Sequence, residues 1–174
     1  ARPEELEQFL DRIFSKTDMK ISVKTRLGME NAEEFPRLME IYNRFPMEEL
    51  IIHPRVQKDF YKNTPNLEIF GEALAISKNT VCYNGDIFSA DDFKRIHAQF
   101  SNVECFMMGR GILADPSLAR EIRGGKAADQ SDIRRFHDLL YHTYREEVSG
   151  DRNVLFKMKE IWFYLAPMFA DSKK

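Results

Sequence analysis

Four short apolar runs recur along the chain at roughly even intervals, each bounded by polar residues, glycine or proline. Runs of this kind are typical of buried β-strands. They predict strands over Ile21–Thr25, Glu49–His53, Thr80–Tyr83 and Glu104–Met108.

Segments with helical spacing of apolar residues precede and separate these runs. Their expected starts are Pro3, the capping boxes Asn31/Glu34 and Ser89/Asp92, and Thr64-Pro65. Strands that alternate with helices predict βαβ units and a parallel sheet, so the expected fold class is α/β.

The pattern changes after the fourth strand. Residues 109–116 are expected to form a loop, followed by a short helix over Pro116–Arg123 with Asp115 as its N-cap. From Ser131 onward the chain is helical in pattern, with one turn near Gly150. We therefore expect a β/α region over residues 1–127 and a helical domain over residues 128–174.

Composition narrows the class of protein. The 174 residues are 43% hydrophobic and 31% charged, as in an ordinary globular protein, and the net charge of −2 argues against a generally basic nucleic-acid coat. Cys82 and Cys105 lie inside predicted strands and are interpreted as buried, inert thiols. The sequence has no Cys/His cluster, so it predicts no metal site. It also has no apparent signal peptide or membrane span, and a cytoplasmic protein is therefore expected.

Polar or glycine-rich clusters lie at the ends of all four predicted strands. They are Lys24 with Arg26, His53-Pro54-Arg55, Asn84-Gly85-Asp86, and Gly109-Arg110-Gly111. In parallel α/β folds the carboxyl ends of the strands meet at one edge, and ligands bind there. The four clusters together outline a ligand site.

The chemistry of these clusters favours an anion. Gly85 and Gly109 admit backbone N–H groups close to a phosphate, Arg110 binds phosphate bidentately, and Lys24 adds a cation. Taken singly, each cluster has a plainer explanation: a tight turn, a solvated lysine, or a buried histidine at His53. Their joint occurrence predicts a site for a cofactor that carries a phosphate.

Four motifs, in this order and spacing, resemble the second half of bacterial tRNA-dihydrouridine synthases: V-K-T-R at 23–26, I-H-P-R at 52–55, N-G-D-I at 84–87 and M-G-R-G at 108–111. Members of that family are FMN enzymes with a (β/α)₈ barrel and a small helical domain. They reduce uridine in tRNA and take electrons from NADPH. The resemblance implies half of a TIM (β/α)₈ barrel here, followed by part of the tRNA-binding helical domain.

The resemblance also implies roles for individual residues. Lys24 contacts the flavin ring and His53 lies beside it, while Arg55 is similar to a family arginine near the target base. Phosphate and ribityl contacts are implied for Asn84, Gly85, Asp86, Gly109 and Arg110. In the helical domain, the cations Arg134, Arg135, Lys157 and Lys159 resemble RNA contacts, although a plain solvated helix face explains them equally well.

Two departures from the family pattern stand out. Proline at Pro54 replaces the glycine of the family's H-G-R. The catalytic cysteine, which donates a proton to the uracil ring from an N-G-C-P context, has no counterpart in this sequence. Because the chain also starts without Met, inside a helical pattern, we expect an inactive fragment that lacks the first four strands and pairs with a second copy through its open edges. Such a half barrel is expected to expose Ile21, Val23, Ile51 and Val81.

Two alternatives remain at this point. Another FMN barrel oxidoreductase, such as a dihydroorotate-dehydrogenase-like enzyme, shares the phosphate site but has no use for a helical tail. A non-catalytic module that binds phosphate or RNA would carry no flavin.

Overall fold

The computed structural model describes residues 2–169. The strands are β1 (Ser22–Gly28), β2 (Glu49–Val56), β3 (Val81–Asn84) and β4 (Cys105–Met107). The longer helices are α1 (Pro3–Phe14), α2 (Phe35–Tyr42), α3 (Leu67–Ile76), α4 (Ala90–Gln99), α7 (Gln130–Glu147) and α8 (Asp151–Leu165). Shorter ones are α5 (Arg110–Ala114), α6 (Leu118–Ile122) and the 3₁₀ turns η1 (Ala32–Glu34), η2 (Gln57–Asp59) and η3 (Ala166–Met168).

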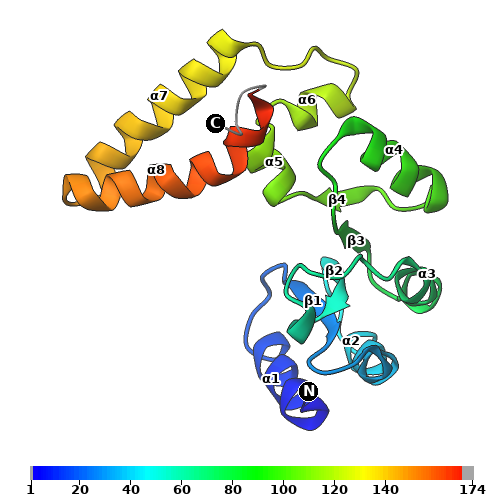
Figure 1. Cartoon of the computed structure of the whole chain (residues 1–174). Helices are drawn as coiled ribbons and strands as arrows, with labels where there is room; N and C mark the ends of the chain where they lie inside the picture. Colours follow the sequence, from blue (N-terminus) through cyan, green and yellow to red (C-terminus); the bar gives the residue numbers. More distant parts are fainter. Residues whose placement is uncertain (1, 170–174) are drawn as a thin grey trace. The chain divides into compact units, whose positions relative to one another are not determined.

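The four strands form one parallel sheet in the order β1-β2-β3-β4, so each strand pairs with the next one in the chain. A doubly wound sheet reverses its strand order part-way, whereas a barrel continues in one direction. The expected fold is confirmed: four consecutive βα units form half of a (β/α)₈ barrel, followed by helices (Figure 1). All four predicted strands are present.

The two faces of the sheet differ in chemistry. Laterally paired residues share a face, and the row that contains Ile52 and Tyr83 packs on the helices: both are almost fully buried, and the Tyr83 ring meets Phe70 of α3 edge to face at 4.9 Å. The opposite face carries the row Lys24, Ile51, Cys82, Cys105, which faces the interior of a barrel.

The expectation that the half barrel exposes Ile51 and Val81 is wrong. Only 7% of Ile51 and 6% of Val81 is exposed. Val81 pairs with Leu50 in a row that faces the helices, and Ile51 lies between the neighbouring strands β1 and β3. Ile21, just before the edge strand β1, and Val23 within it are half-buried.

Three details of the helices differ from the sequence-based expectations. The N-cap of α3 is Asn66, whose side chain accepts from Ile69 N at 3.1 Å, rather than Thr64. The five-residue helix α5 replaces part of the predicted loop, and the N-cap of α6 is Ser117 rather than Asp115. Asp115 instead accepts from Ser117 N at 2.8 Å, which turns the chain just before α6.

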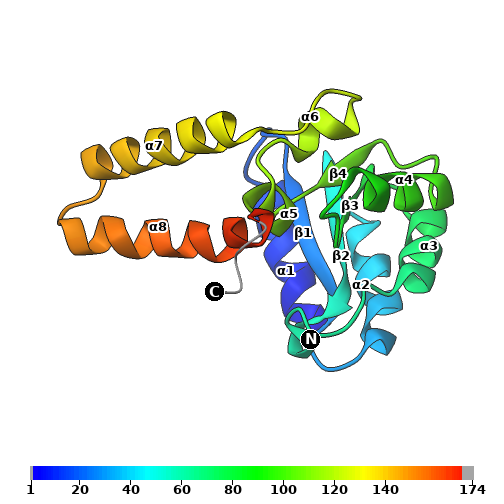
Figure 2. The same ribbon diagram turned by 45° about the horizontal axis from the view of Figure 1, so that its top comes forward.

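The chain divides into two compact units. The first comprises residues 2–85 and 97–107 and holds the whole sheet; the second comprises residues 86–96 and 108–169. Within the second unit α7 and α8 form an antiparallel hairpin (Figure 2). The buried residues of α8 are Val154, Met158, Ile161 and Leu165. The proposed boundary between a barrel region and a helical domain at residue 127 stays a prediction.

Candidate functional site

The residues of the predicted site are divided between the two units, and each set is described by itself. Lys24, His53, Arg55, Asn84 and Gly85 belong to the first unit. Asp86, Gly109 and Arg110 belong to the second.

Lys24 lies in the middle of β1 on the barrel-facing side of the sheet, next to Ile51 of β2. It lines a cavity of about 420 Å³ together with Arg26 and Tyr42. Partial burial and the neighbouring charge of Arg26 lower the pKa of the Lys24 ammonium group. A cation in this position favours an anionic or electron-rich partner.

His53 and Arg55 lie near the carboxyl end of β2 and form a buried pair. They are 5% and 2% exposed, and Arg55 Nη1 lies 3.0 Å from His53 Nε2. Arg55 Nε also donates a short hydrogen bond to Asn63 O, in the segment that follows β2. Residues i and i+2 of a strand share a face, so the alternation of β2 places the two side chains together.

A second arginine, Arg26 of β1, contacts the same segment that follows β2. Arg26 Nη1 donates to Val56 O at 3.0 Å and to Phe60 O at 3.1 Å, and its guanidinium lies 5.5 Å from the centroid of the Tyr61 ring. Tyr61 in turn stacks on His53, with ring centroids 6.0 Å apart. Phe60 has a φ of 50°, a strained value for a residue with a side chain. Two guanidinium groups therefore fix residues 57–63 beside His53.

Asn84 and Gly85 follow β3. Asn84 Nδ2 donates to Met107 O at 2.7 Å and so joins the ends of β3 and β4. A Cβ added to Gly85 would lie 2.1 Å from Tyr83 Oη, so this position admits only glycine unless Tyr83 moves. Both residues shape the end of the sheet within the first unit.

In the second unit Arg110 pairs with Asp86 at 2.6 Å, and both side chains are about 30% exposed. The Arg110 guanidinium also lies 5.3 Å from the centroid of the Phe88 ring. A Cβ added to Gly109 would meet nothing within 4 Å, whereas one added to Gly111 would lie 1.9 Å from Ile87 O. The structure thus leaves open space at Gly109 and packs α5 tightly against the segment that carries Asp86.

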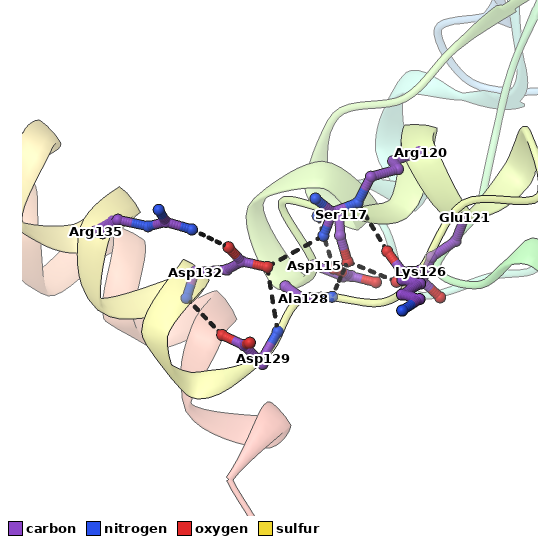
Figure 3. Close-up of polar contacts among 9 residues, drawn as sticks. All are labelled: Asp115, Ser117, Arg120, Glu121, Lys126, Ala128, Asp129, Asp132 and Arg135. Carbon is purple, nitrogen blue, oxygen red and sulfur yellow. Dashed lines mark hydrogen bonds and ion pairs between the residues drawn. The ribbon is translucent and has the colours of Figure 1, made fainter.

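The connection from α6 to α7 is fixed by hydrogen bonds (Figure 3). Buried Ser117 Oγ lies 2.6 Å from carboxylate oxygens of both Asp115 and Glu121 and accepts from Ala128 N at 2.9 Å. Arg120 donates to Lys126 O at 2.7 Å and pairs with Asp132 at 3.3 Å.

Asp132 also closes the start of α7, where it forms a capping box with Asp129 (Figure 3). Hydrogen bonds from Arg135, the Asp129 N–H and Arg120 lower the pKa of the Asp132 carboxyl. The helical hairpin is therefore joined to α6 by an ordered connection.

The four cations that resemble RNA contacts are all exposed on the hairpin. Arg135 is paired with Asp132, and Lys157 lies 3.6 Å from Glu160. Within residues 2–169, Arg134 and Lys159 have no ion-pair partner. These two are the better placed of the four to meet an anionic partner.

Neither thiol resembles a reactive group. Cys82 is buried, and desolvation together with the charge of Glu49 raises its pKa to about 12. A hydrogen bond with Glu49 and partial desolvation raise the pKa of Cys105. The described residues contain no cluster of three or more His, Cys, Asp or Glu side chains able to hold a metal ion. In the same part of the chain, every helix is too short or too polar to cross a membrane.

Sequence reasoning assigned no role to Arg26, Tyr61 or Tyr83. Arg26 belonged to the first strand-end cluster, and because it lies two residues after Lys24 in β1, both side chains are on one face of the sheet. The contact of Tyr61 with His53 and the closeness of Tyr83 to Gly85 depend on the path of loops, which carries no periodic signal.

Comparison with known proteins settles the family. The model of the dihydrouridine synthase (Dus) family matches residues 1–165, nearly the whole chain. The chain belongs to the dihydrouridine synthase family. That membership confirms the resemblance given by the four strand-end motifs.

Among curated proteins, this dihydrouridine synthase chain is similar to the tRNA-dihydrouridine(16) synthases of Shewanella oneidensis and Aquipseudomonas alcaligenes. The first is 29% identical over 154 residues, or 87% of the chain and 48% of the relative. The second is 25% identical over 122 residues, or 70% of the chain and 38% of the relative. A probable tRNA-dihydrouridine synthase of Rickettsia prowazekii is 28% identical over 147 residues and is covered to 45%. The chain thus spans less than half the length of each of these relatives.

Proposed function

We propose that this chain takes part in the reduction of uridine to 5,6-dihydrouridine in tRNA, in the cytoplasm, with FMN as the bound flavin and NADPH as the reductant. The observation that carries the proposal is the family match over residues 1–165. It favours this reaction over that of a dihydroorotate-dehydrogenase-like barrel. It also makes a non-catalytic phosphate or RNA module the weaker alternative.

The chemistry of the residues in each unit supports the proposal of a flavin mononucleotide as the ligand. Open space at Gly109 admits close approach of an anion to the backbone, and Arg110 supplies a guanidinium for the phosphate. Because a carboxylate repels a phosphate, Asp86 orients Arg110 rather than binding the phosphate itself. When bound, reduced flavin would supply the hydride for the uracil ring, and NADPH would restore it.

In the first unit Lys24 and His53 are the groups for the flavin ring, and Asn84 with Gly85 shapes the backbone for the ribityl chain. The ammonium of Lys24 has a lowered pKa, and hydrogen bonding to an electron-rich ring edge would stabilise its charged form. We assign Arg55 no direct contact with the base, because only 2% of it is exposed.

We further propose that these 174 residues alone do not reduce uridine. The reaction needs a proton donor to the uracil ring, and the two cysteines of the sequence lie in β3 and β4 rather than on a loop. The thiol of Cys82 is buried in the sheet. Neither takes the place of the cysteine that the family uses.

Flavin binding is the direct test of the cofactor assignment. The chain is titrated with FMN and the quenching of flavin fluorescence is followed, with Arg110→Met as the variant and Arg37→Met, an exposed arginine of α2, as the control. We expect the first substitution to weaken binding about tenfold to a hundredfold, the cost of a charge-assisted hydrogen bond, and the second to leave it unchanged. Equal affinities of all three proteins would contradict the site.

The reaction is tested with the protein encoded by the complete reading frame. It is incubated with NADPH and unmodified tRNA, and dihydrouridine is measured by mass spectrometry of the nucleosides. Product from that protein and none from residues 1–174 is the expected result. Product from residues 1–174 alone would refute the proposed inactivity.

A second proposal concerns assembly of the chain as given. β1 and β4 each pair with one strand only among residues 2–169, so each has an open edge, and open edges pair readily with other strands. We propose that two copies associate through these edges. Light scattering is expected to show a dimer, and a monomer across the accessible concentration range would refute this assembly.

A further inference from the structure

The contact between Arg55 and His53 decides which nitrogen of the histidine carries the hydrogen. A guanidinium has only donors and stays protonated, so the nitrogen that faces it must accept. Arg55 Nη1 lies 3.0 Å from His53 Nε2. Nε2 is therefore bare, and the hydrogen of the neutral ring resides on Nδ1.

Several contacts prevent the guanidinium and the ring from separating. Arg55 is anchored through Nε to Asn63 O, and Asn66 N donates to Pro54 O at 2.7 Å, so the chain on both sides of the loop is fixed. Tyr61 stacks on the other partner, His53. The pair is 2% and 5% exposed, so water does not compete for Nε2.

We propose that Arg55 is a positioning residue that locks His53 in the neutral tautomer with Nδ1–H. His53 then carries one N–H donor, at Nδ1, and no positive charge. A protonated ring would set an N–H against the guanidinium donor, so the same contact also disfavours imidazolium. This role differs from the place near the target base that the family resemblance implied for Arg55.

The tautomer follows from the contacts of the chain alone. What His53 would donate to rests on the proposed function, in which a flavin lies beside it. A single N–H donor at Nδ1 would fix the orientation of an acceptor in that place without adding to the charge of Lys24.

The test is nitrogen-15 NMR of the imidazole rings at pH 8, where ordinary histidines are neutral. The chain has four histidines, and His53→Gln identifies the signals of His53 by their loss. We expect protonated Nδ1 and unprotonated Nε2 in a ratio of at least about ten to one, which a charge-assisted hydrogen bond maintains. Exposed His142 of α7 serves as the internal reference for an unlocked ring.

Arg55→Met removes the donor and is expected to abolish the single-tautomer pattern of His53, with folding checked by circular dichroism. Should this variant fail to fold, Arg55→Lys decides: lysine is also a pure donor, so Nε2 stays bare if the proposal holds. Arg37→Met is the control and leaves the His53 signals unchanged. A hydrogen on His53 Nε2 in the unmodified chain or in Arg55→Lys, or an unchanged pattern in folded Arg55→Met, overturns the proposal.

The outcome is separable from that of the flavin titration. If the chain binds FMN but the hydrogen of His53 lies on Nε2, the tautomer proposal is refuted and the cofactor assignment still holds. A single His53 tautomer in a chain that binds no FMN would support the tautomer lock and contradict the cofactor assignment.

Discussion

Gly85 and Gly109 have the same expected role in phosphate binding, yet the structure predicts different consequences when each becomes alanine. At Gly85 the new Cβ would lie 2.1 Å from Tyr83 Oη and 2.4 Å from its Cζ. Ordinary contact begins near 3.4 Å, so the ring must shift by roughly 1 Å or more. At Gly109, where φ is −110°, the new methyl group meets nothing.

Tyr83 has little freedom to give way. It is 1% exposed and lies against Phe70 at 4.9 Å and Phe106 at 6.2 Å between ring centroids. Overpacking of this kind costs about 1–3 kcal/mol of unfolding free energy. For a chain of this size that corresponds to a fall in Tm of about 2–12 °C. Gly109→Ala is expected to leave stability unchanged or to raise it by up to about 1 kcal/mol, because alanine restricts the unfolded chain.

The assay is thermal unfolding by circular dichroism, paired with the FMN titration. Gly85→Ala should lose both stability and affinity, while Gly109→Ala should lose affinity alone if the backbone approaches the phosphate there. Tyr83→Phe combined with Gly85→Ala removes the nearest atom but leaves Cζ at 2.4 Å, so only part of the stability should return. Equal melting temperatures for the two alanine variants would refute the reasoning about Tyr83.

Three further predictions concern single side chains. Lys24→Met should keep or slightly raise Tm, since burial and Arg26 disfavour the charged ammonium group. It should weaken FMN binding about tenfold or more in the fluorescence titration. Unchanged affinity would show that Lys24 is not part of the site. Ser89→Ala removes the cap of α4, where Ser89 Oγ accepts from Asp92 N at 3.1 Å, and should cost about 1 kcal/mol in denaturant unfolding; a loss of flavin affinity without a loss of stability would contradict a capping role. Burial raises the pKa of Cys82 to about 12, so its contribution to stability is present below its ordinary pKa of about 9 and declines as pH rises toward 12. Thiol labelling at pH 8 should accordingly reach Cys82 only on unfolding, and rapid labelling of the folded chain would show that the burial is wrong.

The regular part of the fold was predictable because its signals are local and periodic. The strands lie on short runs rich in apolar residues, and the capping box of Asn31 and Glu34 marks the start of η1. Helix α5 was not predictable, because five residues show no period and Gly111 argues against a helix. Asn66 displaced Thr64 as the cap of α3 because both residue types cap helices and only the path of the chain selects one.

The candidate site was predictable in its residue types and less so in their contacts. The alternation of β2 places His53 and Arg55 on one face, so their pairing was within reach of the sequence. The ion pair of Asp86 with Arg110 joins residues 24 apart, on either side of α4 and β4, and no local pattern reports it. The thiol of Cys82 lies in one row with Cys105 because of strand register, which is set by the whole sheet.

The compact unit that contains the hairpin also contains Arg110. Helix α8 and η3 pack against α5, and Leu165 at the end of α8 is fully buried. A chimera that exchanged residues 128–174 for those of a relative would therefore replace the packing partner of the helix that carries the proposed phosphate arginine. If the proposed function holds, such a hybrid would alter the proposed flavin site as well as any RNA contact of the hairpin, so α5 should be exchanged together with the hairpin.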